Sequence, residues 1–486
     1  MEYSIKSIQQ FQEEGIVNLE NIFIDYSDDL TKIAEMVTGV KDGVLELARN
    51  LIAEEWEFYD ERLKKDRIRK EKWEIVRTDE TSLLTSIGTI RYHKTYYRDK
   101  ETGEYCYLLD KAMGLHAHER MTEDAEAELL KEAVASSYRK GGECASITDE
   151  TVSKETVMHK IHRLEFPKVE AQTERKQVRY LYIDADEDHV SLQYINEKGD
   201  IKKPRTNTIM PRLVYIYEGV DRENKRHELL TLKHFGGVYE GAKGVETLWK
   251  EVGEYIEESY DTDYLEKVYI NGDGAGWIKS GAVHIEKGKF VLDRFHMHKY
   301  IIKATSHLMD SADDARSEIY RAIRRKEKHT AETVFNHILE ITDSEAKRKT
   351  VQASKDYILG NWTGIMRWIR DKNENIECSA EGHVSHVLSA RMSSRPLGWS
   401  KVGADKMSRL RIYEANGGDM LELVRYQKRI LPKAAGCEKI CSSAEMFAEE
   451  RKQKRELGIL ADIHLYEIPY PQIKKMAALK NQIWGL

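Results

Sequence analysis

The chain has 486 residues, of which 41% are hydrophobic, and its formal net charge is −7. One hydrophobic core rarely grows beyond about 250–300 residues, so a chain of this length is expected to form several domains. We expect a soluble, cytoplasmic protein, because the sequence holds no run of about 18 apolar residues and does not start with a signal-peptide pattern. The negative charge argues mildly against nucleic-acid binding, since affinity for phosphate depends on clustered Lys and Arg.

The N-terminal part predicts a long helix followed by a hairpin. From about Asp28 to Lys72 apolar residues recur at intervals of three and four, a helical stripe that serves packing or self-association. Residues then alternate from Ile87 to Tyr96, and a turn at Asp99–Gly103 leads to a short run at Tyr105–Leu109, which predicts a β-hairpin. The basic and aromatic residues of this hairpin fit contact with a nucleic-acid backbone, although an ordinary half-exposed sheet explains them equally well.

Residues 121–162 predict three short helices. The first follows a Thr122 cap, the second lies near Cys144–Glu150, and the third opens at a Ser153 N-cap. Gly141 and Gly142 separate the first helix from the second.

The three helices have the order of a helix-turn-helix. The third would then present Lys154 and Lys160, with Thr156 and His159, to a DNA groove. Three short helices are common in any domain, so the pattern leaves DNA reading and plain packing equally open.

After Lys176 the pattern changes to strands alternating with helices. Strands are predicted over Val178–Asp186, Val190–Tyr194, Leu213–Glu218, Val268–Asn271 and Lys289–Leu292, with a helix near Val245–Glu258. Three strands in succession, followed by strands that alternate with helices, favour a mixed sheet over an all-parallel one. Residues 294–370 read as a charged helical block without strand signal, and helices are expected again after Glu381 and over residues 442–457 of the tail.

Acidic residues at the ends of two strands give the strongest chemical signal. The stretch YLYIDADEDHVSLQ (180–193) predicts a buried strand interrupted by acids, and unpaired buried carboxylates are costly. Strand side chains alternate, so Asp184 and Asp186 share one face while Leu181, Ile183 and Ala185 face a core. A second short strand ends at Asp273 in a glycine-rich turn. Two acids at strand ends predict a divalent metal site.

The five cysteines form no even framework: Cys106, Cys144, Cys378, Cys437 and Cys441. Cys437 and Cys441 have a helical spacing but no partner histidines. We therefore expect free thiols and no zinc site.

Four strings resemble a known family: LYIDADEDHVSLQ, INGDGAGWIK, LDRFHMHKYI and SAEGHVSHVLSARMSSRPLGWS. They are similar to the ISLre-two insertion-sequence transposases, a bacterial family related to Mutator-type transposases. The likeness extends from LLDKAMGL to NGGDM, which is most of the chain. It implies a ribonuclease H-like catalytic domain in which three acids bind two metal ions.

The resemblance implies Asp186, Asp273 and Glu381 for the three acids, holding two Mg²⁺ (or Mn²⁺) ions. Asp184 remains an alternative to Asp186 and a further candidate metal ligand, because the two project from one strand face. The 108 positions from Asp273 to Glu381 fit the all-helical insertion that Mutator-type relatives carry before the third acid.

Several further residues are candidates for DNA contact. Phe295 stands where Mutator-type relatives have the cysteine of a cysteine–histidine pair, and His298 is a candidate auxiliary group at the DNA strand, with a structural hydrogen bond as the alternative. Arg391, Arg395 and Lys401 follow Glu381 closely and are candidate phosphate ligands.

The sequence thus predicts a multidomain α/β protein: a ribonuclease H-like mixed-sheet core interrupted by an all-helical insertion, with a mainly helical N-terminal DNA-binding region. The expected parts are a helical region (1–80), a hairpin with a helix-turn-helix (81–170), the core (171–300 and 375–436), the insertion (301–374) and a tail (437–486). The expected activity is a DDE transposase acting on double-stranded DNA as a homodimer or larger homo-oligomer, associated with a bacterial nucleoid. The alternatives are an inactive DNA-binding descendant and a metal-dependent nuclease.

Overall fold

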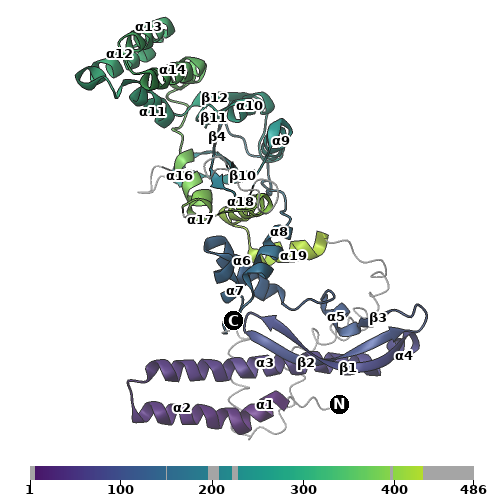
Figure 1. Cartoon of the computed structure of the whole chain (residues 1–486). Helices are drawn as coiled ribbons and strands as arrows, with labels where there is room; N and C mark the ends of the chain where they lie inside the picture. The colour runs from purple at the N-terminus through teal and green to yellow at the C-terminus, as the bar shows by residue number, and fades with distance from the viewer. Residues whose placement is uncertain (1–5, 149, 195–206, 222–227, 395–397, 431–486) are drawn as a thin grey trace, which may run out of the picture. The chain divides into compact units, whose positions relative to one another are not determined.

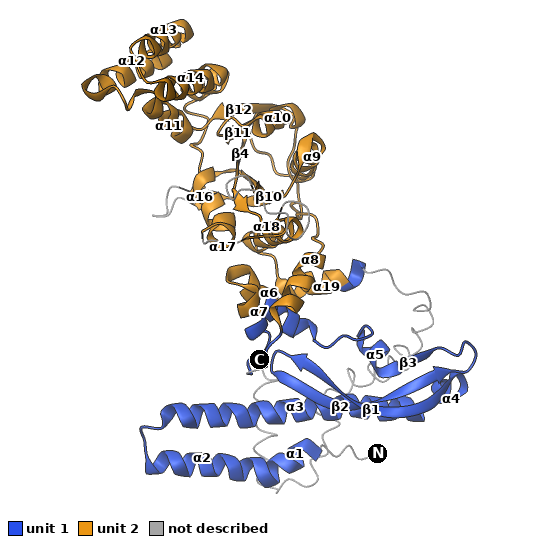
Figure 2. Ribbon diagram, viewed as in Figure 1, with its two compact units in different colours: residues 1–129, 142–152, 428–486 blue, residues 130–141, 153–427 orange. Residues whose placement is uncertain are grey.

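The structure is a computed structural model that describes residues 6–148, 150–194, 207–221, 228–394 and 398–430 (Figure 1). The chain forms two compact units (Figure 2), one of residues 1–129, 142–152 and 428–486 and one of residues 130–141 and 153–427. Helices and strands are both present in each, so the mixed α/β class is confirmed. None of the helices within the described ranges is long and apolar enough to cross a membrane.

The first unit begins with helices and continues into a sheet. Its elements are α1 (Lys6–Gln10), the π-helix η1 (Phe11–Gly15), α2 (Ile16–Asp28), α3 (Ile33–Lys65), α4 (Arg67–Lys72), β1 (Trp73–Thr85), β2 (Gly88–Asp99), β3 (Tyr105–Tyr107) and α5 (Leu108–Met113). Two helices, α6 (Glu123–Ala135) and α7 (Tyr138–Glu143), contain residues of both units.

The predicted long helix is divided at Asp66. Its carboxylate accepts a hydrogen bond from the Arg69 N–H at 2.9 Å, which caps α4 and separates it from α3. Earlier in α3, Asp60 is buried and accepts hydrogen bonds from the Thr95 N–H (3.1 Å) and hydroxyl (2.6 Å). This buried link holds α3 against strand β2.

The hairpin prediction is confirmed in part. Strand β3 pairs antiparallel with the end of β2, as expected, but β2 pairs along its whole length with a strand that the sequence did not indicate, β1. Most β1 side chains from Glu74 to Glu80 are exposed. They are mainly polar, so the apolar alternation that predicts a strand is missing.

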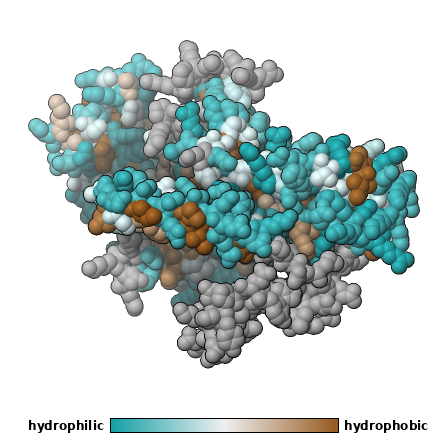
Figure 3. Space-filling model, turned by 90° about the horizontal axis from the view of Figure 1, so that it is seen from below, coloured by the Kyte–Doolittle hydropathy of each residue, from teal (hydrophilic) through white to brown (hydrophobic). Residues whose placement is uncertain are grey.

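Helix α2 packs on α3 without burying a single residue of its own. A Cβ at Gly39 of α3 would lie only 2.8 Å from Ile22, so glycine permits this close approach. Nine large apolar side chains of this region are exposed: Ile8, Ile16, Val17, Phe23, Ile24, Leu30, Ile33, Val37 and Val44. Figure 3 views the molecule from the side on which α2 lies in Figure 1, and it shows apolar residues among hydrophilic ones.

Of the three helices predicted over residues 121–162, the first and the third are confirmed, but the second, predicted near Cys144–Glu150, is wrong: the helix between them is α7, which ends at Glu143. The chain breaks at Ser136–Ser137, where the Ser137 hydroxyl accepts from the Lys140 N–H at 3.1 Å, and α7 then runs through both glycines. Residues 144–148 are not helical. The Ser153 N-cap is confirmed, since its hydroxyl accepts from the Thr156 N–H at 3.2 Å at the start of α8 (Lys154–Arg163).

The second unit is built around a five-stranded sheet. Its strands are β4 (Tyr180–Glu187), β7 (Arg212–Tyr217), β10 (Lys233–Gly237), β11 (Lys267–Gly272) and β12 (Gly288–Leu292), in the order β10-β7-β4-β11-β12. Two small ribbons accompany it: β5 (Val190–Ser191) with β6 (Thr208–Ile209), and β8 (Gly219–Asp221) with β9 (Glu228–Leu230). The helices are α9 (Gly241–Ser259), α10 (Gly276–His284), α11 (Arg294–Thr305), η2 (Met309–Ser311), α12 (Ala312–Arg325), α13 (Lys328–Glu340), α14 (Glu345–Gly360), α15 (Trp362–Arg370), α16 (Ala380–Val384), the π-helix η3 (Ser385–Ser389), α17 (Ala390–Met392), α18 (Lys401–Ala415) and α19 (Met420–Ile430).

The sheet is mixed, as the sequence predicts. Strand β7 is antiparallel to both of its neighbours, β4 and β10, whereas β4, β11 and β12 are parallel. Strand β10 was not predicted, because KHFGG is short and ends in two glycines that weaken a strand pattern. The expected faces of β4 are confirmed: Leu181, Ile183 and Ala185 are fully buried in the core, together with Trp249 of α9.

The predicted helical block is also confirmed. Residues 294–370 hold α11 to α15 and no strand. The rings of Tyr300 on α11 and Tyr357 on α14 stack with centroids 3.7 Å apart. After this block the chain returns to the sheet, where the Ser379 N–H donates to Asp184 at 2.8 Å.

The expected free thiols are present at Cys106, Cys144 and Cys378. Cys437, Cys441 and the helix predicted over 442–457 lie outside the described residues.

Candidate active site

Acidic side chains gather where three neighbouring parallel strands end. Strand β4 carries Asp184 and Asp186, β11 leads directly into Asp273, and β12 is followed by Asp293. The carboxyl ends of parallel strands meet at one edge of a sheet, so their polar side chains converge there. Each of these four acids is buried or half-buried.

Asp184 is fully buried and surrounded by hydrogen-bond donors. Its Oδ2 accepts from the Tyr215 hydroxyl at 2.8 Å and from the Ser379 N–H at 2.8 Å. Its Oδ1 accepts from the Asn271 amide at 2.8 Å and from the Tyr217 hydroxyl at 3.2 Å. Burial raises the pKa of this carboxyl, while the hydrogen bonds act in the opposite direction. Both oxygens are therefore engaged in joining β4 to β7, to β11 and to the residue before α16.

Asp186 lies two residues farther along β4 and is half-buried. Burial raises its pKa to about 6, and the negative charge of Asp273 adds to the rise. Its Oδ1 accepts from the Glu187 N–H at 2.9 Å. No hydrogen bond occupies its second oxygen within the described part of the chain.

Asp273 occupies a tight turn between β11 and α10. Gly274 has a φ of +87°, a conformation that favours glycine. The Asp273 Oδ1 accepts from the Ala275 N–H at 2.8 Å, and the Tyr357 hydroxyl of the helical block donates to the Asp273 carbonyl oxygen. The turn that carries Asp273 is thus held by one hydrogen bond within the turn and by another from helix α14.

Asp293 and His296 form a third part of the cluster. Asp293 caps α11 by accepting from the N–H groups of Phe295 (3.1 Å) and His296 (3.3 Å), and it also contacts the His296 Nδ1 at 2.9 Å. This contact raises the pKa of His296, with smaller contributions from Asp186 and Asp273. A protonated imidazole here would partly neutralise the acids.

Glu381, the third acid of the implied triad, is exposed on the first turn of α16. This short helix follows Ser379, which is bonded to Asp184, so the structure brings the segment that bears Glu381 to strand β4. Across the part of the chain that the structure describes, no three His, Cys, Asp or Glu side chains already stand in a metal-binding arrangement.

The predicted auxiliary histidine lies elsewhere. His298 Nδ1 contacts the Tyr320 hydroxyl of α12 at 2.7 Å, which is the structural hydrogen bond weighed against a DNA role. His296, two residues earlier on α11, is the histidine that interacts electrostatically with Asp186 and Asp273.

The predicted phosphate ligands differ in exposure. Lys154 is exposed at the start of α8 and lies 3.7 Å from Glu155, and Lys160 is half-buried on the same helix. Lys401 is exposed at the start of α18, 3.8 Å from Glu240. Arg395 lies outside the described residues.

Arg391 is buried, whereas a side chain that binds a DNA phosphate has to be accessible from solvent. Its Nε donates to the Ala133 carbonyl oxygen at 3.2 Å, and its guanidinium lies 4.9 Å from the ring centre of Trp399. Trp399 is itself buried, and its indole N–H donates to the Met392 carbonyl oxygen. Both side chains hold α17 and the residues around it in place.

Sequence reasoning missed Asp293 and His296. The signal was available, since Asp293 follows the predicted strand Lys289–Leu292 just as Asp273 follows the strand before it. Applying the strand-end argument to the third parallel strand would have found Asp293, and His296 lies one helical turn beyond it.

Comparison with known proteins gives consistent matches. The model of an uncharacterised protein family, UPF0236, matches residues 26–429. A UPF0236 protein of Caldanaerobacter subterraneus subsp. tengcongensis is 40% identical over 404 residues, covering 83% of this chain and 82% of its own, and its name joins eleven numbered designations. A second UPF0236 protein from that organism is 39% identical over 420 residues, covering 86% of this chain and 85% of its own, and its name joins four designations. A UPF0236 protein of Streptococcus gallolyticus, named for the vanSb 3′ region, is 24% identical over 364 residues (71% and 75%). The chain therefore belongs to the UPF0236 family.

Proposed function

We propose that the chain is a DNA transposase of the ISLre-two type, which cuts DNA at transposon ends and joins those ends to target DNA. Its catalytic domain is ribonuclease H-like and spans residues 171–300 and 375–436, and the helical block at 301–374 is an insertion. It acts on double-stranded DNA as a homodimer or larger assembly on the bacterial nucleoid.

The sheet topology supports this proposal. A mixed sheet in the order β10-β7-β4-β11-β12, with an antiparallel half, a parallel half and acids on the central strand, suits a ribonuclease H-like core. The block α11–α15 follows the third parallel strand, and the chain then comes back to β4 at Ser379. A long separation in sequence between Asp273 and Glu381 is therefore compatible with one site.

The observation that carries the proposal is the pairing of Asp186 with Asp273. They end adjacent parallel strands, and each keeps a carboxylate oxygen that accepts no hydrogen bond from the described residues. The charge of Asp273 adds to the raised pKa of Asp186. Two acids placed close together in a half-buried site repel each other unless a cation is bound. Such a site favours divalent-ion binding over structural packing.

The residues fit Mg²⁺ (or Mn²⁺), because carboxylate oxygens are hard ligands of the kind these ions take. Asp186, Asp273 and Glu381 would hold two ions, and Asp184 would not be a ligand because its oxygens already accept four hydrogen bonds or more. When bound, two such ions activate a water or a 3′-hydroxyl for attack on a phosphodiester and stabilise the leaving oxygen.

The protein's own groups orient this chemistry. Asp184 fixes the position of β4 relative to Ser379, and thereby of Glu381 two residues later. Asp293 holds His296 at Nδ1 and raises the pKa of its imidazole, so protonation beside the acids is favoured and Nε2 is left to donate to a phosphate oxygen. Lys154, Lys160 and Lys401 serve as phosphate contacts, and Arg391 serves packing.

The names of the relatives add support of another kind. We take each joined designation for a gene copy, so that one protein sequence recurs at eleven places in one genome and another at four. Recurrence of one protein at many loci is the trace that a mobile element leaves.

A strand-transfer assay tests the proposal. The purified chain is incubated with a plasmid carrying the DNA that flanks its gene, in Mg²⁺ or in EDTA. We expect nicks that expose 3′-hydroxyls at the element boundaries, and joined products, in Mg²⁺ alone. Cleavage without joining would indicate a nuclease, and binding without cleavage would indicate an inactive descendant.

A further inference from the structure

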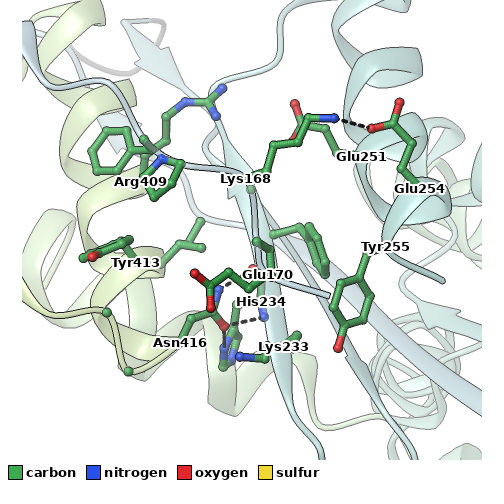
Figure 4. Close-up of a pocket in the computed structure, with 18 of the residues that line it drawn as sticks. Lys168, Glu170, Lys233, His234, Glu251, Glu254, Tyr255, Arg409, Tyr413 and Asn416 are labelled. Carbon is green, nitrogen blue, oxygen red and sulfur yellow. Dashed lines mark hydrogen bonds and ion pairs between the residues drawn. The ribbon is translucent and has the colours of Figure 1, made fainter. Parts of the chain in front are cut away.

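A cavity of about 470 Å³ lies beside the edge strand β10, and none of the acids of the candidate active site lines it. Its walls come from α9, from residues 166–170, from β10, and from the segment between Arg409 and Glu422 (Figure 4). All of these residues belong to the second unit.

Aromatic rings form much of the wall. Phe166, Phe235, Tyr255 and Tyr413 line the cavity, together with Ile412. Aromatic faces attract cations, and flat apolar walls also accept alkyl chains. The wall therefore suits a ligand that is both cationic and aliphatic.

Carboxylates are in excess around these rings. Six acids line the cavity (Glu170, Glu251, Glu254, Glu258, Asp419 and Glu422) against three basic residues (Lys168, Lys233 and Arg409). Two of the three bases are already paired with acids: Lys168 with Glu254 at 2.9 Å, and Arg409 with Asp405 at 2.9 Å.

Three of the acids form a row along α9. Glu251, Glu254 and Glu258 are three and four residues apart, so they share one face of the helix and are separated by about 4.5 and 6 Å along its axis. These steps are similar to the distances between nitrogens joined by three or four methylene groups. The row thus matches the spacing of a linear aliphatic amine.

The middle position of this row already binds an alkylammonium. The Lys168 Nζ donates to the Glu254 Oε2 at 2.9 Å, and Figure 4 shows this side chain reaching across to α9. Glu251 accepts from the Tyr239 hydroxyl, whereas Glu170 and Glu258 are exposed. Lys168 therefore occupies one of the positions that a longer amine would fill.

A buried polar atom in the same wall lacks a partner. Tyr255, on α9 between Glu254 and Glu258, is only 3% exposed, and its hydroxyl has no partner at hydrogen-bonding distance among the described residues, although it is near enough to Tyr260 to contribute to the raised pKa of that residue. An unsatisfied buried hydroxyl is costly unless a ligand or water completes it. An amine lying along the row would provide that partner.

We propose that this cavity binds a linear aliphatic polyamine, with ammonium groups on the α9 carboxylates and methylene chains against the aromatic wall. The ligand displaces Lys168 from Glu254 and hydrogen-bonds the Tyr255 hydroxyl. This proposal is independent of DNA cleavage, because it concerns the free protein.

Calorimetric titration of the full chain at low salt, without DNA, tests the proposal with spermidine, putrescine and butylamine as probes. Each additional ammonium–carboxylate pair contributes a factor of about 1.5–5, so the affinity is expected to rise in steps from butylamine to putrescine to spermidine. Glu258→Gln is expected to weaken spermidine binding about threefold. Glu246→Gln, an equal charge change at an exposed position of α9 outside the cavity, serves as the control.

Lys168→Ala provides the sharpest comparison. It removes the competing ammonium, so spermidine should bind more tightly than to Lys243→Ala, which removes an equal charge from α9 outside the cavity. Tyr255→Phe keeps the ring and should fold normally, with a higher melting temperature and a lower affinity for spermidine.

Three results would overturn the proposal: equal affinity for the three amines, equal effects of Glu258→Gln and Glu246→Gln, or equal effects of Lys168→Ala and Lys243→Ala. The first would mean that the carboxylates of the cavity do not bind the ammonium groups, and either of the other two would reduce the cavity to a generally acidic surface. A transposition assay with no activity would leave these titrations unaffected, so the two proposals fail separately.

Discussion

Two aspartates on one strand, Asp184 and Asp186, share a face and have different environments. Asp184 is fully buried among donors from three segments, whereas Asp186 is half-buried, has an oxygen that no described residue hydrogen-bonds, and has a charged neighbour in Asp273. The alternation of side chains along a strand leaves both aspartates as candidate metal ligands, because it determines which face of the sheet they lie on and not which residues they contact. At the scale of single residues, hydrogen-bond occupancy distinguishes an acid that supports the fold from one that is available to a cation.

Asp186→Asn should stabilise the metal-free protein. The folded pKa of about 6 lies above the ordinary Asp value of about 4, so the unfolded chain loses this proton first as the pH rises. The free energy of unfolding therefore falls between about pH 4 and 6 and stays lower above pH 6, by about 2–3 kcal/mol. Because other titrating groups are common to both proteins, the difference in free energy of unfolding between wild type and variant, measured by urea unfolding in EDTA across pH 4–8, should show this fall.

The exposed Asp263 offers a matched control for that experiment. Asp263→Asn should leave the pH dependence of unfolding as in the wild type. A difference between wild type and Asp186→Asn that stays constant between pH 4 and 6, or that rises there, would contradict the assigned environment of Asp186.

Asp184→Asn should have the opposite effect on stability. The new amide would direct hydrogens at donors from Tyr215 and Ser379, and losing hydrogen bonds to a buried charge costs about 2–4 kcal/mol. The expected result is a lower urea midpoint and faster amide exchange at Ser379. If Asp184→Asn were as stable as the wild type, this acid would not be the link between β4 and α16.

At the scale of elements, the helical block α11–α15 holds the turn after β11. The Tyr357 hydroxyl donates to the Asp273 carbonyl, and the Asn361 side chain lies so close to Gly274 that a Cβ there would be 2.7 Å from its Oδ1. The block thus contacts the backbone of the turn that carries one of the candidate metal ligands. A helical block packed in this way stabilises the backbone that carries Asp273.

Tyr357→Phe tests this contact. Loss of one hydrogen bond of about 1 kcal/mol should quicken amide exchange at Gly274 and Ala275 and lower DNA cleavage several-fold, with the fold kept. Tyr320→Phe is the control, since it removes a hydroxyl of the same block that contacts His298 instead. Equal effects of the two variants would mean that the contact at Asp273 has no special importance.

Helix α8 carries the prediction about DNA contact. Replacing Lys154 and Lys160 with Ala should weaken binding to end DNA and reduce the slope of log affinity against log salt by about one unit per lost phosphate contact. A salt titration by fluorescence anisotropy measures both. An unchanged slope would move DNA recognition to another element.

Much of the element order could be predicted, and the failures have physical causes. Strand β4 was predicted because its apolar residues are continuous, and α8 because Ser153 caps it. Strand β1 was missed because the residues of its first half are exposed on both faces and mainly polar, and β10 because two glycines end it. For the site, acids at strand ends were visible in the sequence, whereas the burial of Arg391 and the role of His296 depend on packing between distant segments.

At the scale of the whole molecule, the second unit contains the acidic cluster, the helical block and the polyamine cavity, while the first unit presents exposed apolar residues on α2 and α3. The account rests on one claim: the acids at the ends of β4 and β11 form a divalent-ion site for phosphodiester chemistry. Stability and exchange measurements describe the parts of that site, and a cleavage measurement addresses the claim itself.

The most direct measurement compares wild type and Asp273→Asn for cleavage of transposon-end DNA in Mg²⁺, with end binding measured on the same samples. Asn has nearly the volume of Asp but lacks the charge, so the variant should fold and bind ends with at most a small change in affinity. We predict that its cleavage and strand transfer fall below detection, and that Glu381→Gln behaves in the same way. Normal cleavage by Asp273→Asn in Mg²⁺ would contradict the account.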